Sequence, residues 1–179
     1  MMAQELSGPS VLLLMGVAGS GKTTTGELLS RRLGWPFRDA DSFHPPANIE
    51  KMSRGVPLTD EDRWPWLHAI AAWMDERLAR GEHGIISCSA LKRAYRDVLL
   101  GGRPRARLVF LKGEKSLIAG RMAARTDHFM PPALLDSQFA TLEEPGPDED
   151  ALVVDVTPPP EAVAAFIASR LGLAAVRER

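Results

Sequence analysis

A glycine-rich segment constrains this sequence more than any other feature. Residues 16–23 read GVAGSGKT and fit the phosphate-loop pattern G-x-x-x-x-G-K-[S/T] at every fixed position. The motif requires a buried strand before the glycines and a helix after the lysine. The apolar residues 11–15 and the helical pattern of residues 24–33 supply both. Glycines allow the backbone N–H groups to turn toward an anion, so we predict that the chain binds the phosphates of a nucleotide.

The residues of this loop have distinct expected roles. Lys22 can reach the β- and γ-phosphates, and the hydroxyl of Thr23 can bind Mg²⁺. The helix that follows directs its positive N-terminal end toward the same phosphates. The predicted ATP-binding residues are Gly16, Val17, Ala18, Gly19, Ser20, Gly21, Lys22, Thr23 and Thr24.

Two acidic residues follow a short second strand predicted at 36–38. Side chains two residues apart on an extended segment point the same way, so Asp39 and Asp41 are expected to face one site. Ligands of open α/β sheets bind just beyond the carboxyl ends of the strands. A solvated turn is the alternative, and the nearby phosphate loop favours the functional interpretation.

Apolar runs alternate with helical patterns along the rest of the chain. This alternation predicts an α/β fold over residues 1–179, in which helices cover both faces of a five-stranded parallel sheet. One helix start stays open, because Thr59 and Asp62 resemble a capping box whereas Pro65 suits a start near Trp64. The other predicted strands are 85–88, 108–111 and 152–156, and the other helices are 47–54, 66–80, 114–125, 133–142 and 161–171.

Basic residues mark two further helices. Lys92 and Arg96 lie in the first turns of a helix, where a bound anion would relieve their repulsion by the helix dipole. We therefore favour a substrate contact for both over a solvated basic face. Arg121 and Arg125 lie one turn apart on another helix. We interpret residues 121–142 as a helical lid that closes over a triphosphate, with a solvent-facing arginine pair as the alternative.

Composition excludes several other classes of protein. The formal net charge of −1 argues against a general nucleic-acid binder, and the apolar runs are too short to span a membrane. Residues 1–10 contain no Lys or Arg, so the charged start of a signal peptide is absent. Cys88 is the only cysteine, which excludes an internal disulfide and agrees with a cytoplasmic location.

Several segments together resemble the thermoresistant gluconokinases, from the first predicted strand to the last. Besides the phosphate loop, these include DADSFHP at 39–45, NIEKM at 48–52, DEDR at 60–63, SCSALK at 87–92 and SQF at 137–139. The resemblance implies a fold like that of the nucleoside monophosphate kinases and a homodimer. It also implies transfer of the γ-phosphoryl group of ATP to the 6-hydroxyl of D-gluconate, which yields 6-phosphogluconate and ADP.

The resemblance allows roles to be assigned to the candidate residues. Asp41 is expected to accept the proton of the sugar hydroxyl and Asp39 to hold Mg²⁺ through water, although these two roles can be exchanged. Arg121 and Arg125 join Lys22 and Asp41 as the catalytic residues. The expected substrate-binding residues are Asp41, His44, Lys51, Arg63, Ser89, Lys92, Arg96, His128 and Gln138, and the cation that binds the carboxylate stays open.

Two other functions compete with this one. A kinase of the same fold could act on shikimate or on a nucleoside monophosphate. A nucleotide switch would bind without phosphorylating a small molecule. A guanine switch needs an N-K-x-D segment, and Asn48, the only asparagine, is followed by Ile-Glu, which argues against it.

Overall fold

A five-stranded parallel sheet forms the centre of the protein, as predicted. The computed structural model describes residues 6, 8, 10–125 and 132–176. The strand order is β2-β3-β1-β4-β5, so β1 and the glycine-rich loop that follows it lie in the middle of the sheet. The strands are β1 (Val11–Met15), β2 (Phe37–Asp39), β3 (Gly84–Ser87), β4 (Ala106–Lys112) and β5 (Leu152–Asp155).

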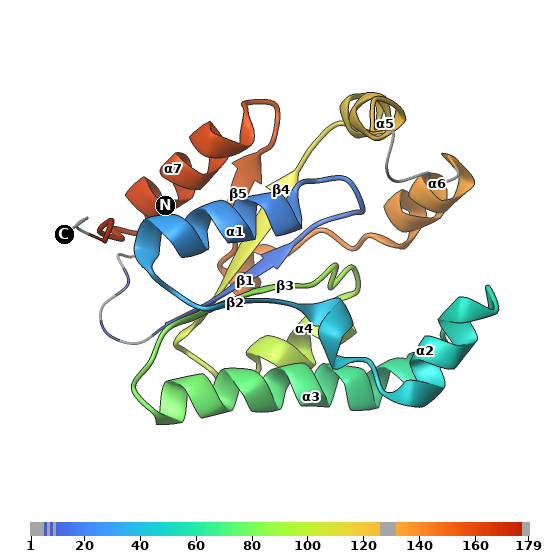
Figure 1. The fold of residues 1–179 in the computed structure, drawn as a ribbon, viewed down its shortest axis with the longest axis horizontal. Helices are drawn as coiled ribbons and strands as arrows, with labels where there is room; N and C mark the ends of the chain where they lie inside the picture. The colour runs from blue at the N-terminus through green and yellow to red at the C-terminus, as the bar shows by residue number, and fades with distance from the viewer. Residues whose placement is uncertain (1–5, 7, 9, 126–131, 177–179) are drawn as a thin grey trace.

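Helices cover both faces of this sheet and give a three-layer architecture (Figure 1). Side chains alternate along β1: Leu12 and Leu14 face one apolar cluster, and Leu13 and Met15 face the other. Both faces are covered, which explains why β1 is a continuous apolar run rather than an alternating one. One layer contains α1 (Lys22–Leu33) and α7 (Pro160–Arg170), and the other contains α3 (Asp60–Ala79) and α4 (Arg93–Leu100).

Three more helices surround the end of the sheet at which the strands terminate. These are α2 (Pro46–Ser53), α5 (Lys115–Ala123) and α6 (Pro132–Thr141). A small apolar cluster joins Val17 of the glycine-rich loop to Leu91, to Ile118 of α5 and to Leu135 of α6. Among the described residues, no helix is both long and apolar enough to cross a bilayer.

The structure decides where α3 begins. The Thr59 hydroxyl accepts a hydrogen bond from the Asp62 N–H at 3.2 Å, and the Asp62 carboxylate accepts one from the Thr59 N–H at 2.9 Å. This capping box starts the helix at Asp60, and Pro65 lies inside it. The helix tolerates the proline because the fully buried Leu67 and Ile70 hold it against the sheet.

Candidate active site

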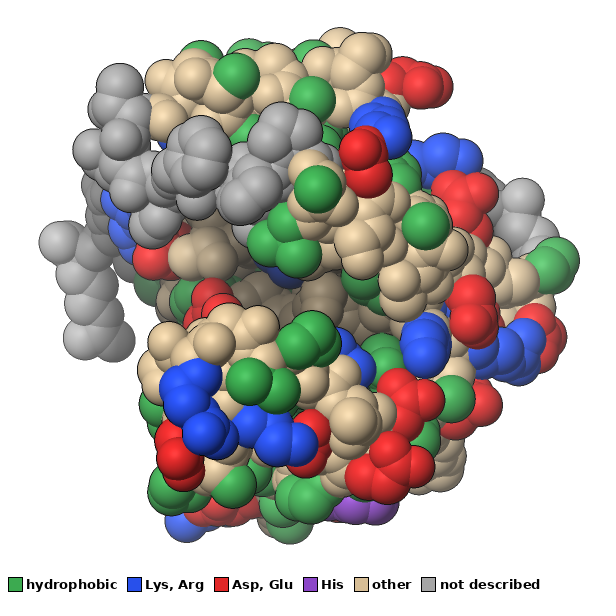
Figure 2. Space-filling model, turned by 90° about the vertical axis from the view of Figure 1, so that its right-hand side faces the viewer, with side chains coloured by type: hydrophobic (Ala, Val, Ile, Leu, Met, Phe, Trp, Pro, Cys, Tyr) green, Lys and Arg blue, Asp and Glu red, His purple; other side chains and the backbone are tan. Residues whose placement is uncertain are grey.

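A cavity of about 920 Å³ lies between α2 and α6 and is lined by residues that follow β2 and β3. Figure 2 views the molecule from this side and shows the surface hollowed between an upper and a lower lobe. Its walls come from η1 (Ala40–Phe43), α2, α3, the segment after β3, α4 and α6. Six of the predicted substrate-binding residues line it: Asp41, His44, Arg63, Ser89, Lys92 and Gln138.

The glycine-rich loop turns tightly above the start of α1. Gly19 and Gly21 have φ values of +79° and +91°, which only glycine adopts readily. The Lys22 ammonium donates to the carbonyl oxygens of Gly16 and Val17 at 2.9 and 3.0 Å. Burial lowers the pKa of Lys22 to about 8. Desolvation therefore disfavours the charged form of Lys22, and an anion bound beside it would raise this pKa again.

The two acidic residues after β2 are not arranged as predicted. Asp39 ends the strand, but Asp41 lies in the 3₁₀ helix η1 (Ala40–Phe43), because the Asp39 carboxylate accepts a hydrogen bond from the Asp41 N–H at 2.9 Å and caps this turn. The prediction that both lie on one extended segment is therefore wrong. The two residues remain neighbours. Desolvation is the larger cause of the raised pKa of Asp41, and the charge of Asp39 is the second.

The surroundings separate these two carboxylates. Asp39 accepts a hydrogen bond from the Thr23 hydroxyl at 3.1 Å, whereas Asp41 lines the large cavity and lies 4.0 Å from the His44 ring. Oxygen ligands of this kind suit Mg²⁺. The described residues contain no cluster of three or more His, Cys, Asp or Glu side chains that could hold a metal ion. A magnesium ion beside Thr23 and Asp39 would therefore need phosphate or water for its remaining ligands.

Arg121 and Arg125 line a smaller cavity of about 120 Å³, next to the glycine-rich loop. Arg121 donates to the carbonyl oxygens of Val156 and Thr157, the latter at 2.8 Å, beyond the end of β5. These two bonds fix the orientation of its planar guanidinium. Pro158 and Thr24 also line this cavity.

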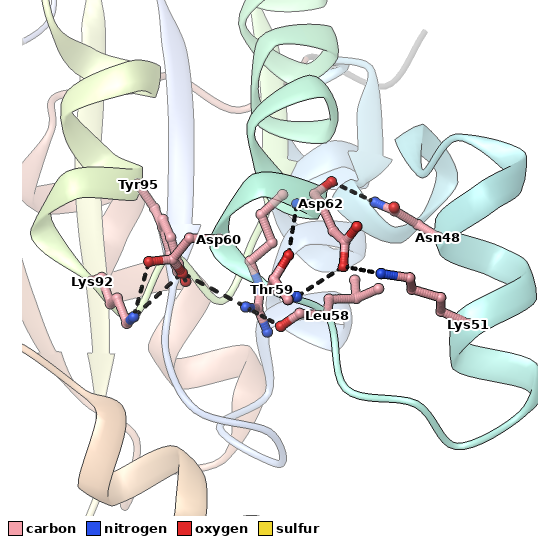
Figure 3. Close-up of polar contacts among 9 residues, drawn as sticks. Asn48, Lys51, Leu58, Thr59, Asp60, Asp62, Lys92 and Tyr95 are labelled. Carbon is pink, nitrogen blue, oxygen red and sulfur yellow. Dashed lines mark hydrogen bonds and ion pairs between the residues drawn. The ribbon is translucent and has the colours of Figure 1, made fainter.

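Lys51, predicted to bind the substrate, does not line the large cavity. Figure 3 shows it pointing toward Asp62 of α3, whose carboxylate it contacts at 2.7 Å. This hydrogen bond lowers the pKa of Asp62 to about 2. The Asn48 amide donates to the Asp62 carbonyl at 2.9 Å. The two side chains thus attach α2 to the start of α3, and the structure replaces the predicted substrate contact of Lys51 with a structural one.

Asp60 gathers three other side chains at the wall of the cavity (Figure 3). It accepts hydrogen bonds from the Tyr95 hydroxyl at 2.5 Å and from the Lys92 ammonium at 3.3 Å, and the Arg63 guanidinium lies 3.9 Å away. Lys92, Arg63 and Tyr95 all line the cavity. Two cations therefore share one carboxylate, which leaves positive charge for an anionic ligand.

Sequence reasoning missed Tyr95. Lys92 is the N-cap residue of α4, and Tyr95 lies in the first turn of this helix, three residues later. That spacing is the signal that could have identified it.

Arg96 is a second correction. It is only 1% exposed, and its guanidinium contacts the Glu149 carboxylate at 2.7 and 3.1 Å. It also donates to the carbonyl oxygens of Ala90 and Leu91 at 2.9 and 3.2 Å. These bonds occupy the guanidinium away from the large cavity, so the predicted substrate contact of Arg96 is wrong. His128 lies outside the described residues.

Comparisons with known proteins show what this chain is similar to. The family model described as Shikimate kinase matches residues 18–152. A gluconokinase of Gluconobacter oxydans (strain 621H) is 46% identical over 87% of this chain and 87% of its own length. The thermoresistant gluconokinase of Escherichia coli (strain K12) is also 46% identical, over 87% of this chain and 89% of its own.

A solved structure extends the likeness to three dimensions. The crystal structure of a gluconokinase from Sinorhizobium meliloti 1021 has a TM-score of 0.82 and 45% sequence identity, and covers 93% of this chain and 94% of its own. With this identity over most of its length, the chain belongs to the gluconokinase family of P-loop kinases.

Proposed function

We propose that this protein is an ATP-dependent gluconokinase, which transfers the γ-phosphoryl group of ATP to the 6-hydroxyl of D-gluconate and releases 6-phospho-D-gluconate and ADP. The main support is one cavity lined by an acid, Asp41, and two cations, Arg63 and Lys92. Gln138 lines the same cavity and accepts a hydrogen bond from Ala18 of the phosphate loop. This donor set suits a molecule with a carboxylate at one end and hydroxyl groups along its length.

The triphosphate would lie along the glycine-rich loop, with the Lys22 ammonium against its terminal phosphates. We assign the small cavity beside Arg121 to the adenine base, because two carbonyl oxygens fix the orientation of its planar guanidinium, which offers a stacking surface. This assignment replaces the phosphate contact predicted for Arg121. Arg125, one turn further along the chain, is then the residue proposed to clamp the phosphates. Thr23 and Asp39 would hold Mg²⁺, whose charge helps to neutralise the transferring group.

Asp41 is the proposed general base. It lines the acceptor cavity, and desolvation and the neighbouring charge of Asp39 raise its pKa, which makes it a stronger proton acceptor than an ordinary aspartate. The contact of Asp39 with Thr23 favours the metal role for Asp39. The proton of the 6-hydroxyl would pass to Asp41 as the oxygen attacks phosphorus.

The gluconate carboxylate would bind between Arg63 and Lys92. Their shared partner Asp60 compensates only one of the two charges, so an incoming carboxylate restores the balance. Among the other cations that the sequence predicted to bind the substrate, Lys51 and Arg96 each pair with a carboxylate of their own. This difference in pairing supports the choice of Arg63 and Lys92.

A coupled assay of ADP release tests the proposal. Gluconate, shikimate and a nucleoside monophosphate would be supplied in turn with ATP and magnesium, and we expect turnover with gluconate alone. Turnover with shikimate instead would replace the acceptor but keep the kinase. Slow hydrolysis of ATP at a rate that none of these acceptors changes would favour a nucleotide switch. The homodimer and the cytoplasmic location stay predictions, which sedimentation and cell fractionation can test.

A further inference from the structure

One hydrogen bond joins the phosphate loop to the opposite wall of the cavity. The side-chain oxygen of Gln138, on α6, accepts from the backbone N–H of Ala18 at 2.6 Å. The two residues are 120 positions apart in the sequence. Gln138 also lines the large cavity, together with Asp41, Arg63 and Lys92. A single side chain therefore touches the loop proposed for ATP and the cavity proposed for gluconate.

The chemistry of the amide group gives its two ends different tasks. A backbone N–H is a donor, so the carbonyl end of Gln138 must face Ala18. The amino end carries two N–H donors, which Ala18 cannot use. Hydroxyl and carboxylate oxygens of a sugar acid are the acceptors that such donors prefer.

Contacts on both sides of Gln138 link α6 to the phosphate loop and to the segment after β3, so a movement of the phosphate loop would also move α6. Leu135, one turn before Gln138, packs in the apolar cluster that includes Val17 of the loop. At the other end of the helix, the Glu143 N–H donates to the Leu91 carbonyl at 2.8 Å. The backbone of α6 is therefore attached on both sides of Gln138.

We propose that Gln138 is a positioning residue that couples the binding of the two substrates. The Ala18 N–H fixes the carbonyl end of Gln138 and leaves its amino end for gluconate, and a nucleotide bound to the phosphate loop would stabilise this arrangement. Coupling of binding free energies is reciprocal, so gluconate raises the affinity for the nucleotide by the same factor. This inference rests on the proposed function, because it takes gluconate as the second ligand.

Calorimetry on the full chain tests the coupling. The Kd of gluconate is measured with and without a nonhydrolysable ATP analogue and magnesium, and the ratio is the coupling factor. We expect about 5-fold or more for the natural sequence, the lower end of typical coupling. Gln138→Leu removes both ends of the amide and is expected to bring the factor within about twofold of unity.

Two more variants separate the tasks of the amide. Gln138→Glu keeps an acceptor for Ala18 but removes both donors, so it is expected to weaken gluconate binding more than analogue binding. Asp136→Asn, on the same helix, alters an ion pair with Lys115 instead and is expected to keep the coupling factor. If Gln138→Leu does not fold, Gln138→Asn, which is one methylene shorter, is expected to lose the coupling in its place.

The outcomes distinguish this inference from the proposed function. A natural protein that binds gluconate with no effect of the analogue would overturn the coupling but leave the kinase assignment intact. The same holds for a folded Gln138→Leu variant with the full coupling factor. Absence of gluconate binding in the natural protein, by contrast, would remove the proposed substrate itself.

Discussion

Replacing Arg96 by methionine tests whether this arginine is a structural residue. The change removes two contacts with Glu149 and two hydrogen bonds to backbone carbonyls, at a side chain that is 1% exposed. Glu149 would keep its hydrogen bond from the Gly146 N–H but would lose its counterion. Breaking a buried ion pair on one side typically costs about 3–5 kcal/mol. For a chain of this size, that lowers the melting temperature by roughly 6–20 °C.

Urea denaturation and steady-state kinetics measure the two sides of this prediction. The free energy of unfolding should fall by the amount above, while the KM for gluconate of the folded fraction stays within about threefold of the natural value, roughly 0.7 kcal/mol. Arg93→Met is a matched control on the same helix, because Arg93 contacts Asp148 and Asp97 at the exposed surface. It should affect stability far less.

The opposite pattern would refute this reasoning. An Arg96→Met variant with nearly natural stability and a KM for gluconate raised more than tenfold would return Arg96 to the substrate site.

Three other predictions follow from the site and the packing. Asp41→Asn should lower kcat in the ADP-release assay by about 10²–10⁴-fold, and a nearly natural kcat would exclude Asp41 as the base. Affinity for an ATP analogue should stay constant below the Lys22 pKa of about 8 and fall as pH rises through it, whereas Lys22→Arg should show no such fall in calorimetry. Gly26→Ala would place a Cβ atom 2.3 Å from the Phe37 ring and should cost about 1–3 kcal/mol in urea denaturation, unlike Gly120→Ala, which has open space.

Local patterns predicted most elements of the fold, but not the arrangement of the sheet. The run VLLLM and the glycine at position 34 define β1 and the end of α1, because burial on both faces and a positive φ each leave a direct mark on the sequence. The strand order leaves no such mark, since alternation of strands and helices does not say on which side of β1 the next strand pairs. The turn at Asp39 was only the alternative to an extended segment, and it forms because a side-chain cap competes with extended backbone.

The candidate site shows the same limit for charges. Residue type and position suggested Lys51, Arg63, Lys92 and Arg96 alike. Their partners come from elsewhere in the chain, and Glu149 lies 53 residues beyond Arg96, so the sequence cannot reveal which cation is already neutralised.

The pairing of the four cations separates structural roles from proposed substrate contacts. Lys51 and Arg96 each have one carboxylate to themselves, at 2.7 Å in both cases, and neither lines the cavity. Arg63 and Lys92 share the Asp60 carboxylate at 3.9 and 3.3 Å, and both line the cavity. A cation that is paired with its own carboxylate is already neutralised before a ligand binds, so it attracts a further anion only weakly. A shared carboxylate leaves one charge uncompensated next to the cavity, and a substrate carboxylate can supply the missing partner.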